Sequence, residues 1–158
     1  MIDLFPDFHD ILIELADAEV DFVLVGAFAL AFHGHPRATK DIDIFVRATD
    51  ANAQKLYLAL AKFGAPLSQF DTTEKDFAES GNVLQIGVPP RRIDIINSVT
   101  GITFDDALEE SLGFQLDGRH IKVVGFAALV KNKRAAGRPQ DVADVKALTD
   151  PRRAGRKT

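Results

Sequence analysis

Apolar residues recur along the chain at two spacings, one typical of helices and the other typical of strands. Phe8, Ile11, Leu12 and Leu15 lie three or four positions apart or side by side, which predicts an amphipathic helix. Short runs that are almost wholly apolar predict buried strands instead. The predicted helices are residues 6–19, 27–32, 50–63, 104–111, 126–136 and 140–149. The predicted strands are residues 22–25, 41–46, 82–88, 91–96, 114–116 and 120–124.

Turn-forming residues separate these elements and set the fold class. Pro89-Pro90 divides two strands into a hairpin-like pair, and Asp117-Gly118 is a strong hairpin turn signal. Residues 65–80 are mostly polar and are expected to be irregular. The resulting order, α-β-α-β-α-β-β-α-β-β-α-α, predicts a mixed α/β fold (an α+β mixed sheet) with a short helical extension at its C-terminal end. We expect a single domain over residues 1–150.

Composition narrows the class of protein. Of the 158 residues, 46% are hydrophobic, which is enough for a substantial core. The absence of cysteine excludes disulfides and thiolate zinc sites. Since the chain has no apolar run of membrane-spanning length and begins with acids rather than a basic leader, we expect a soluble cytoplasmic protein. Basic residues gather only in the tail, residues 151–158, which we expect to be disordered: either a solvated end or a weak handle for RNA or DNA.

Three aspartates stand in apolar runs, where an uncompensated charge costs stability. Asp41 and Asp43 alternate with isoleucines, so both project from one face of a strand, with Cα atoms roughly 6–7 Å apart. Asp94 stands in a similar run, and it can converge on them if the two strands are neighbours. Converging carboxylates raise one another's pKa. A hard cation such as Mg²⁺ relieves this repulsion and commonly shares the phosphates of a substrate.

Other interpretations of the aspartate pattern remain open. Alternating aspartates also occur on the solvated face of a half-exposed strand. A phosphatase of the haloacid type needs threonine or valine where this chain has Phe45. Sugar-nucleotide transferases carry a similar Asp-x-Asp, but their domains are usually longer. A zinc site at His33 and His35 lacks any further supporting ligand.

Gly26 lies between a predicted strand and a predicted helix, where the backbone must turn or approach another group closely. The following helix starts at Ala27 and presents free N–H groups to an anion. A loop then carries Arg37 and Thr39 just before Asp41. Arg37 and Thr39 suit contact with a triphosphate. A solvated loop is the alternative.

These residues together resemble the DNA polymerase beta-like nucleotidyltransferase superfamily. Its signature is a glycine followed by Gly or Ser, then a gap, then an Asp-x-Asp or Asp-x-Glu strand, with a third aspartate on a later strand. The segment Val25-Gly26-Ala27, then Asp41-Ile-Asp43, and finally Asp94 match that order. Ala27 departs from the usual Gly or Ser, so that position offers an N–H to a phosphate but no hydroxyl.

The chain is most similar to small AbiEii-like nucleotidyltransferase toxins of the abortive-infection type. They carry a His-Gly…Arg-x-Thr-x-Asp-x-Asp stretch, which matches residues 33–43, and a later lysine-to-arginine-to-aspartate segment, which matches residues 133–144. The likeness extends over residues 22–149.

The lysine of the second segment corresponds to Lys133, on an otherwise apolar face of the predicted helix 126–136. Its charge needs a carboxylate or a triphosphate as partner, unless the side chain extends to solvent. Arg138, Asp141 and Asp144 follow it. They form either a helix cap with a surface pair, or a polar network that orients Lys133 or the acceptor.

The resemblance implies a metal-dependent transfer of a nucleoside monophosphate (NMP) from an NTP to an acceptor hydroxyl of tRNA or protein. Asp41, Asp43 and Asp94 would bind Mg²⁺ or Mn²⁺, and Asp94 would also help to deprotonate the acceptor. Lys133 would take part in catalysis. The nucleotide would contact residues 26, 27, 37, 39, 133 and 138. Toxin relatives imply an antitoxin partner. The alternatives are a nucleotidyltransferase-fold binding or regulatory module with weak catalysis, and transfer to a small molecule.

Overall fold

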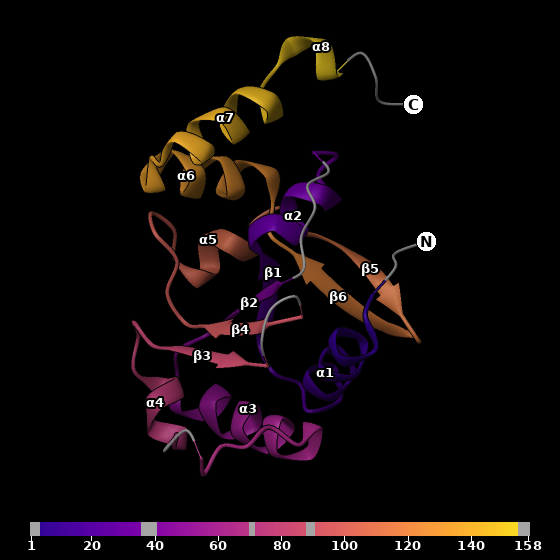
Figure 1. The fold of residues 1–158 in the computed structure, drawn as a ribbon, viewed down its shortest axis with the longest axis vertical. Coiled ribbons are helices and arrows are strands. Elements are labelled where there is room, and N and C mark those ends of the chain that lie inside the picture. The colour runs from indigo at the N-terminus through magenta and orange to yellow at the C-terminus, as the bar shows by residue number, and fades with distance from the viewer. Residues whose placement is uncertain (1–3, 36–40, 70–71, 88–90, 155–158) are drawn as a thin grey trace.

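The protein is described here from a computed structural model, which covers residues 4–35, 41–69, 72–87 and 91–154. A six-stranded mixed sheet forms its centre, with strand order β3-β4-β2-β1-β6-β5 (Figure 1). The strands are β1 Phe22–Val25, β2 Ile42–Val46, β3 Val83–Ile86, β4 Ile93–Ile96, β5 Leu112–Leu116 and β6 Arg119–Val123. The mixed α/β fold predicted from the sequence is therefore confirmed.

Helices lie at both ends of the view in Figure 1, with α2 and α5 between them. Helix α3 packs against α1 and α4 at the lower end, whereas α6 and α7 pair at the upper end. The helices are α1 Pro6–Asp17, α2 Gly26–Phe32, α3 Asp50–Phe63, α4 Glu74–Ala78, α5 Phe104–Leu108, α6 Phe126–Ala136, α7 Pro139–Leu148 and α8 Pro151–Ala154. None of the helices in the described part of the chain combines the length and the apolar character that crossing a membrane would need.

Strand β2 is the element that positions the site. It pairs antiparallel with β1 and parallel with β4. Ile42 and Ile44 are fully buried on one face of the sheet, and Phe45 is buried on the other, where its ring meets Phe104 edge-on at 5.2 Å. Because β2 is covered on both faces, a polar side chain on it is shielded from water unless a cleft opens beside it.

One of the predictions about irregular segments was wrong. Helix α4 lies within the polar stretch 65–80; the backbone N–H of its N-cap, Thr73, donates to the Asp76 carboxylate at 2.9 Å, and Phe77 is its one buried residue. Helix α8 spans Pro151–Ala154 at the start of the C-terminal tail, and disorder of that tail stays a prediction. The Asp150 carboxylate accepts the Arg152 N–H at 3.0 Å, and a proline stands at the first helical position, where it is well tolerated. Residues 155–158 lie outside the described ranges.

Candidate active site

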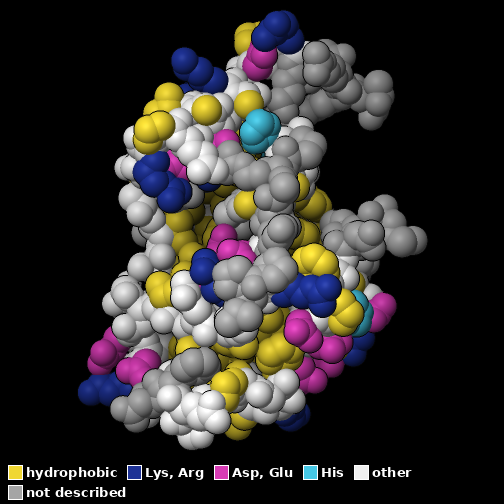
Figure 2. Space-filling model, viewed as in Figure 1, with side chains coloured by type: hydrophobic (Ala, Val, Ile, Leu, Met, Phe, Trp, Pro, Cys, Tyr) yellow, Lys and Arg dark blue, Asp and Glu magenta, His cyan; other side chains and the backbone are white. Residues whose placement is uncertain are grey.

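The parallel register of β2 and β4 brings two of the predicted aspartates together. Asp43 is the direct partner of Asp94, and both project from the same face of adjacent strands. Asp41 precedes β2, and Arg92 stands opposite it, just before β4. We call Asp41, Asp43, Asp94 and Arg92 the carboxylate cluster. On the face in Figure 2, acidic side chains gather near the centre, over the middle of the sheet, with basic side chains beside them.

Arg92 holds the cluster together. Its Nε donates to Oδ1 of Asp94 at 2.9 Å and its Nη2 to Oδ2 of Asp94 at 3.1 Å. The same Nη2 lies 3.3 Å from Oδ2 of Asp41, and the backbone N–H of Arg92 donates to Oδ1 of Asp41 at 3.3 Å. Sequence reasoning did not assign Arg92 a role, although its two-residue spacing from Asp94 places both side chains on one face.

The pKa of Asp43 is raised by its surroundings in the cluster. Burial raises its pKa from 3.8 to about 7, and the neighbouring charge of Asp94, a hydrogen bond with Asp94 and the charge of Asp41 act in the same direction. The Arg92 guanidinium opposes the shift without cancelling it. Among the described residues, the cluster contains three carboxylates and one arginine, so its negative charge exceeds its positive charge.

Two features of the structure favour glycine at position 26. Its φ is +70°, in the region that only glycine adopts readily. A Cβ at this position would also collide with the carboxylate of Asp43. The predicted close approach at the strand–helix junction is therefore present, and the group approached is a site aspartate. Ala27 follows in the first turn of α2, whereas Arg37 and Thr39 lie outside the described residues.

A cleft of about 530 Å³ joins the sheet to α6 and α7. Gly26 and Asp43 line it from the sheet, and Lys133 and Arg138 line it from the helices. Four of the predicted site residues thus share one cavity. Residues 98–100, which follow β4, and Asn132 of α6 also line it; Asn132 donates to the carbonyl oxygen of Thr100 at 2.9 Å. That wall was not predicted, because nothing in the sequence pairs the loop with α6.

On the helical side, Lys133, Arg138, Asp141 and Asp144 form what we call the α6–α7 network. The ammonium of Lys133 is buried and lies 3.3 Å from one carboxylate oxygen of each aspartate. Arg138 binds the Asp141 carboxylate through Nε at 2.7 Å and Nη2 at 3.2 Å. Hydrogen bonds from Arg138, and then from Lys133, lower the pKa of Asp141 to about 2 against the effect of burial. The structure thus contains a polar network around Lys133, and it also contains the helix cap, because the backbone N–H of Arg138 donates to Asp141 at 3.2 Å. An orienting role of the network stays a prediction.

His33 and His35, which follow α2, contact other segments of the fold. His33 donates from Nε2 to the carbonyl oxygen of Val124 at 2.7 Å, and Nε2 of His35 lies 3.5 Å from Asp144. Within the described ranges, no three acidic, histidine or cysteine side chains stand ready to hold a metal ion. The oxygen donors of the carboxylate cluster suit Mg²⁺ or Mn²⁺ chemically. Their present arrangement does not, because Arg92 spans Asp41 and Asp94.

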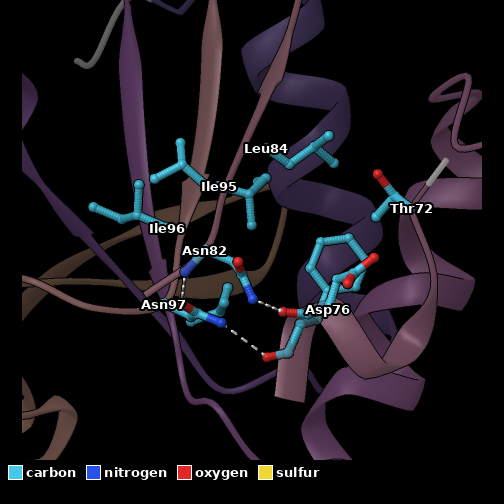
Figure 3. Close-up of a pocket in the computed structure, with 10 residues that line it drawn as sticks. Thr72, Asp76, Asn82, Leu84, Ile95, Ile96 and Asn97 are labelled. Carbon is cyan, nitrogen blue, oxygen red and sulfur yellow. Dashed lines mark hydrogen bonds between the residues drawn. The ribbon is translucent and has the colours of Figure 1, made fainter. Parts of the chain in front are cut away.

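A smaller cavity of about 130 Å³ lies between α4 and the β3–β4 pair (Figure 3). Its polar groups are already used. The Asn97 amide donates to the carbonyl oxygens of Phe77 and Glu79 at 3.2 and 2.7 Å, and its oxygen accepts the Asn82 N–H at 2.8 Å. These bonds fasten α4 to the sheet, so we regard the cavity as part of the scaffold.

Comparison with known proteins identifies the family. Residues 10–124 match the family model described as nucleotidyl transferase AbiEii toxin, type IV TA system. The chain belongs to the AbiEii family. It is a nucleotidyltransferase, as the resemblance in the sequence implied. The matched segment contains the whole carboxylate cluster and ends before the α6–α7 network. No curated protein gives a significant sequence match.

Solved structures share the AbiEii chain's fold at low sequence identity. A predicted nucleotidyltransferase, TM1012, from Thermotoga maritima has a TM-score of 0.57 and 14% identity, and covers 92% of this chain and 94% of its own. The lincosamide antibiotic adenylyltransferase LnuA, bound to lincomycin, has a TM-score of 0.57 and 16% identity. The match covers 93% of this chain and 97% of LnuA. ANT(2")-Ia in complex with adenylyl-2"-tobramycin has a TM-score of 0.54 and 12% identity. The match covers 89% of this chain and 84% of ANT(2")-Ia.

Proposed function

We propose that the chain moves an NMP from an NTP to an acceptor hydroxyl at the cleft beside β2. The observation that carries this proposal is the Asp43–Asp94 pair: burial and the neighbouring charge of Asp94 raise the pKa of Asp43, and Asp43 lines a cavity of about 530 Å³. An acid whose pKa is raised by burial and by like charge, and which stands in a cleft, is a strong candidate for a functional group.

Asp41, Asp43 and Asp94 are the residues that would hold a divalent cation, Mg²⁺ or Mn²⁺, once Arg92 gives way. When bound, such an ion neutralises the charge that develops on the phosphate oxygens. Asp94 is our candidate for accepting the proton of the acceptor hydroxyl, because it is the direct strand partner of Asp43, which lines the cleft.

Arg138 is the cation best placed to meet the triphosphate. Its side chain is 72% exposed and lines the cleft, although it also binds Asp141. Lys133 is enclosed by two carboxylates, so we assign its charge to holding α6 against α7 at the cleft wall. Direct contact of Lys133 with phosphate stays a prediction. The same holds for contacts of phosphate with the backbone of Gly26 and Ala27, and with Arg37 and Thr39.

The acceptor is proposed to be a hydroxyl of tRNA or of a protein, with a toxin role and an antitoxin partner, in keeping with the AbiEii family. A small-molecule acceptor is the second candidate. LnuA is a lincosamide adenylyltransferase, and it and this chain cover each other almost completely. A chain of about this length can therefore be long enough for transfer to a small molecule.

The test is incubation of the chain with each radiolabelled NTP in cell extract, followed by separation into RNA, protein and small-molecule fractions. The proposal predicts label in one fraction, dependent on divalent metal. Label in RNA or protein supports the first acceptor class, and label in small molecules supports the second. Absence of label with all four NTPs would favour a binding or regulatory module.

A further inference from the structure

Arg92 occupies a position that the proposed metal would need. A single guanidinium faces both oxygens of Asp94 and one oxygen of Asp41, while the Arg92 backbone N–H faces the remaining oxygen of Asp41. All four carboxylate oxygens of Asp41 and Asp94 therefore contact the same residue, Arg92. Among the three acids, only Asp43 has no such contact with Arg92 in the structure.

We propose that Arg92 is a tethered cation that competes with divalent metal for Asp41 and Asp94. The inference rests on the proposed function, since it takes these aspartates as the metal site. Competition by Arg92 explains two observations about the cluster. The cluster has the carboxylates that a metal site needs, yet the described residues contain no group of three acids arranged to hold an ion.

Competition follows from charge and from geometry. The guanidinium and a divalent ion are both positive and require the same oxygens, so they repel each other when both are in place. A forked, two-point arginine–carboxylate contact is also among the stronger hydrogen-bonded pairs. A metal that takes Asp94 must break that contact, and its apparent affinity is reduced accordingly.

The surroundings allow the side chain of Arg92 to leave while its backbone stays. The carbonyl oxygen of Arg92 accepts the N–H of Ile42 at 3.0 Å, which fixes the backbone to β2. The side chain is 30% exposed, whereas that of Asp94 is 11% exposed. Movement of the arginine toward solvent therefore uncovers the carboxylates without disturbing the pairing of β2 and β4.

The first experiment measures Mn²⁺ affinity of the metal-stripped chain by electron paramagnetic resonance, without nucleotide. Arg92→Gln is expected to bind Mn²⁺ at least tenfold more tightly than the native chain. Adding Asp43→Asn to that variant should remove the gain, which locates the ion at the cluster. The matched control is Arg91→Gln, because the neighbouring Arg91 guanidinium lies over the Phe5 ring at 4.6 Å; it should bind Mn²⁺ as the native chain does.

If Arg92→Gln binds Mn²⁺ no more tightly than the native chain, including the case in which neither binds, the proposal is overturned. None of these outcomes depends on nucleotidyl transfer. A failure of the labelling experiment and a failure of this inference are therefore distinguishable.

A second measurement uses the native chain and so avoids any folding defect of the variant. The Nε–H resonance of Arg92 is followed by NMR while Mg²⁺ is added. Arg119 supplies an internal control, since it binds Asp17 through Nε at 2.9 Å and Nη2 at 3.1 Å, the same geometry as the Arg92–Asp94 contact. Saturating Mg²⁺ should shift the Arg92 signal and leave that of Arg119 in place. An Arg92 signal that does not move contradicts displacement.

Discussion

The carboxylate cluster reaches the cleft through Asp43, and the α6–α7 network reaches it through Lys133, Arg138 and Asp141, yet the two groups balance their charges in opposite ways. The cluster has three carboxylates and one arginine, whereas the network has two carboxylates and two cations. Their pKa shifts differ accordingly. The pKa of Asp43 is raised to about 7, while that of Asp141 is lowered to about 2.

The difference indicates which cluster serves ligands and which serves the fold. Shielded acids that retain excess negative charge gain from an added cation, so the folded protein holds them in readiness for one. Acids that are matched by an equal number of cations gain nothing from an added cation, and removing one acid leaves the buried Lys133 ammonium short of a partner. The comparison predicts that substitutions in the cluster act on transfer and that substitutions in the network act on stability.

The largest expected effect is on catalysis. Asp43→Asn should reduce NTP-dependent labelling by roughly 10³-fold or more, the scale on which loss of a group acting in the transition state is felt. The fold should persist, because the substitution removes a carboxylate whose charged form burial disfavours. Labelling rates and far-UV circular dichroism check both points.

The control for that variant is Asp7→Asn, an exposed acid of α1, which should label at the native rate. Native-rate labelling by Asp43→Asn itself would remove the carboxylate cluster from the mechanism.

The next effect is on stability and lies on the other side of the comparison. Asp141→Asn should lower the free energy of unfolding by about 3–5 kcal/mol, because it leaves the buried Lys133 ammonium and Arg138 short of a carboxylate. Urea unfolding measures the loss. Asp17→Asn breaks an exposed contact of similar geometry with Arg119 and should lower the free energy of unfolding far less, because solvent screens that pair. Equal losses in the two variants would show that burial of the network contributes nothing.

Gly26→Ala probes the junction at which the backbone meets the cluster. A left-handed φ and the collision with Asp43 together should cost about 2–3 kcal/mol. Gly64→Ala separates the two causes. Gly64 has φ +95° and no atom within 4 Å of an added Cβ, so only the conformational cost of about 1 kcal/mol remains. If unfolding midpoints in urea fall equally for both variants, Asp43 does not press on Gly26.

The smallest effect is a pH dependence. Since the pKa of Asp141 falls from 3.8 in the unfolded chain to about 2 in the folded protein, its ionised form stabilises the fold above about pH 4. That contribution is lost as the pH falls toward 2. Urea unfolding of the native chain between pH 4.5 and 2 should therefore show an acid-induced loss of stability that is smaller in Asp141→Asn. Parallel curves for the two proteins would mean that the Asp141 pKa is not lowered by the fold.

Alternation of apolar and acidic residues was enough to predict that Asp94 could converge on Asp43 if their strands were neighbours, and the parallel pairing of β2 with β4 meets that condition. The strands are regular, and a period of two fixes which side chains share a face. The contacts of Arg92 with Asp41 and Asp94 were not predicted, because the same pattern does not say whether an arginine side chain turns toward its neighbours or toward water. Helix α4 was missed for a related reason: one turn of mostly polar residues has no periodicity, and capping by Thr73 and packing of Phe77 hold it in place.

The helical side of the cleft was only partly predictable. The inward position of Lys133 followed from helical spacing. Its choice of Asp141 and Asp144 over a triphosphate depends on how α6 packs against α7, which no local pattern encodes. The contact of Asn132 with Thr100 likewise joins segments that are far apart in the sequence.

The most direct test of the account is calorimetric titration of the native chain and of Asp94→Asn with each Mg·NTP. The account predicts saturable heat with one site per chain for at least one nucleotide, and its loss in Asp94→Asn with the fold intact. No heat from the native chain with any nucleotide, or unchanged binding by Asp94→Asn, would contradict the claim that the carboxylate cluster is the nucleotide site.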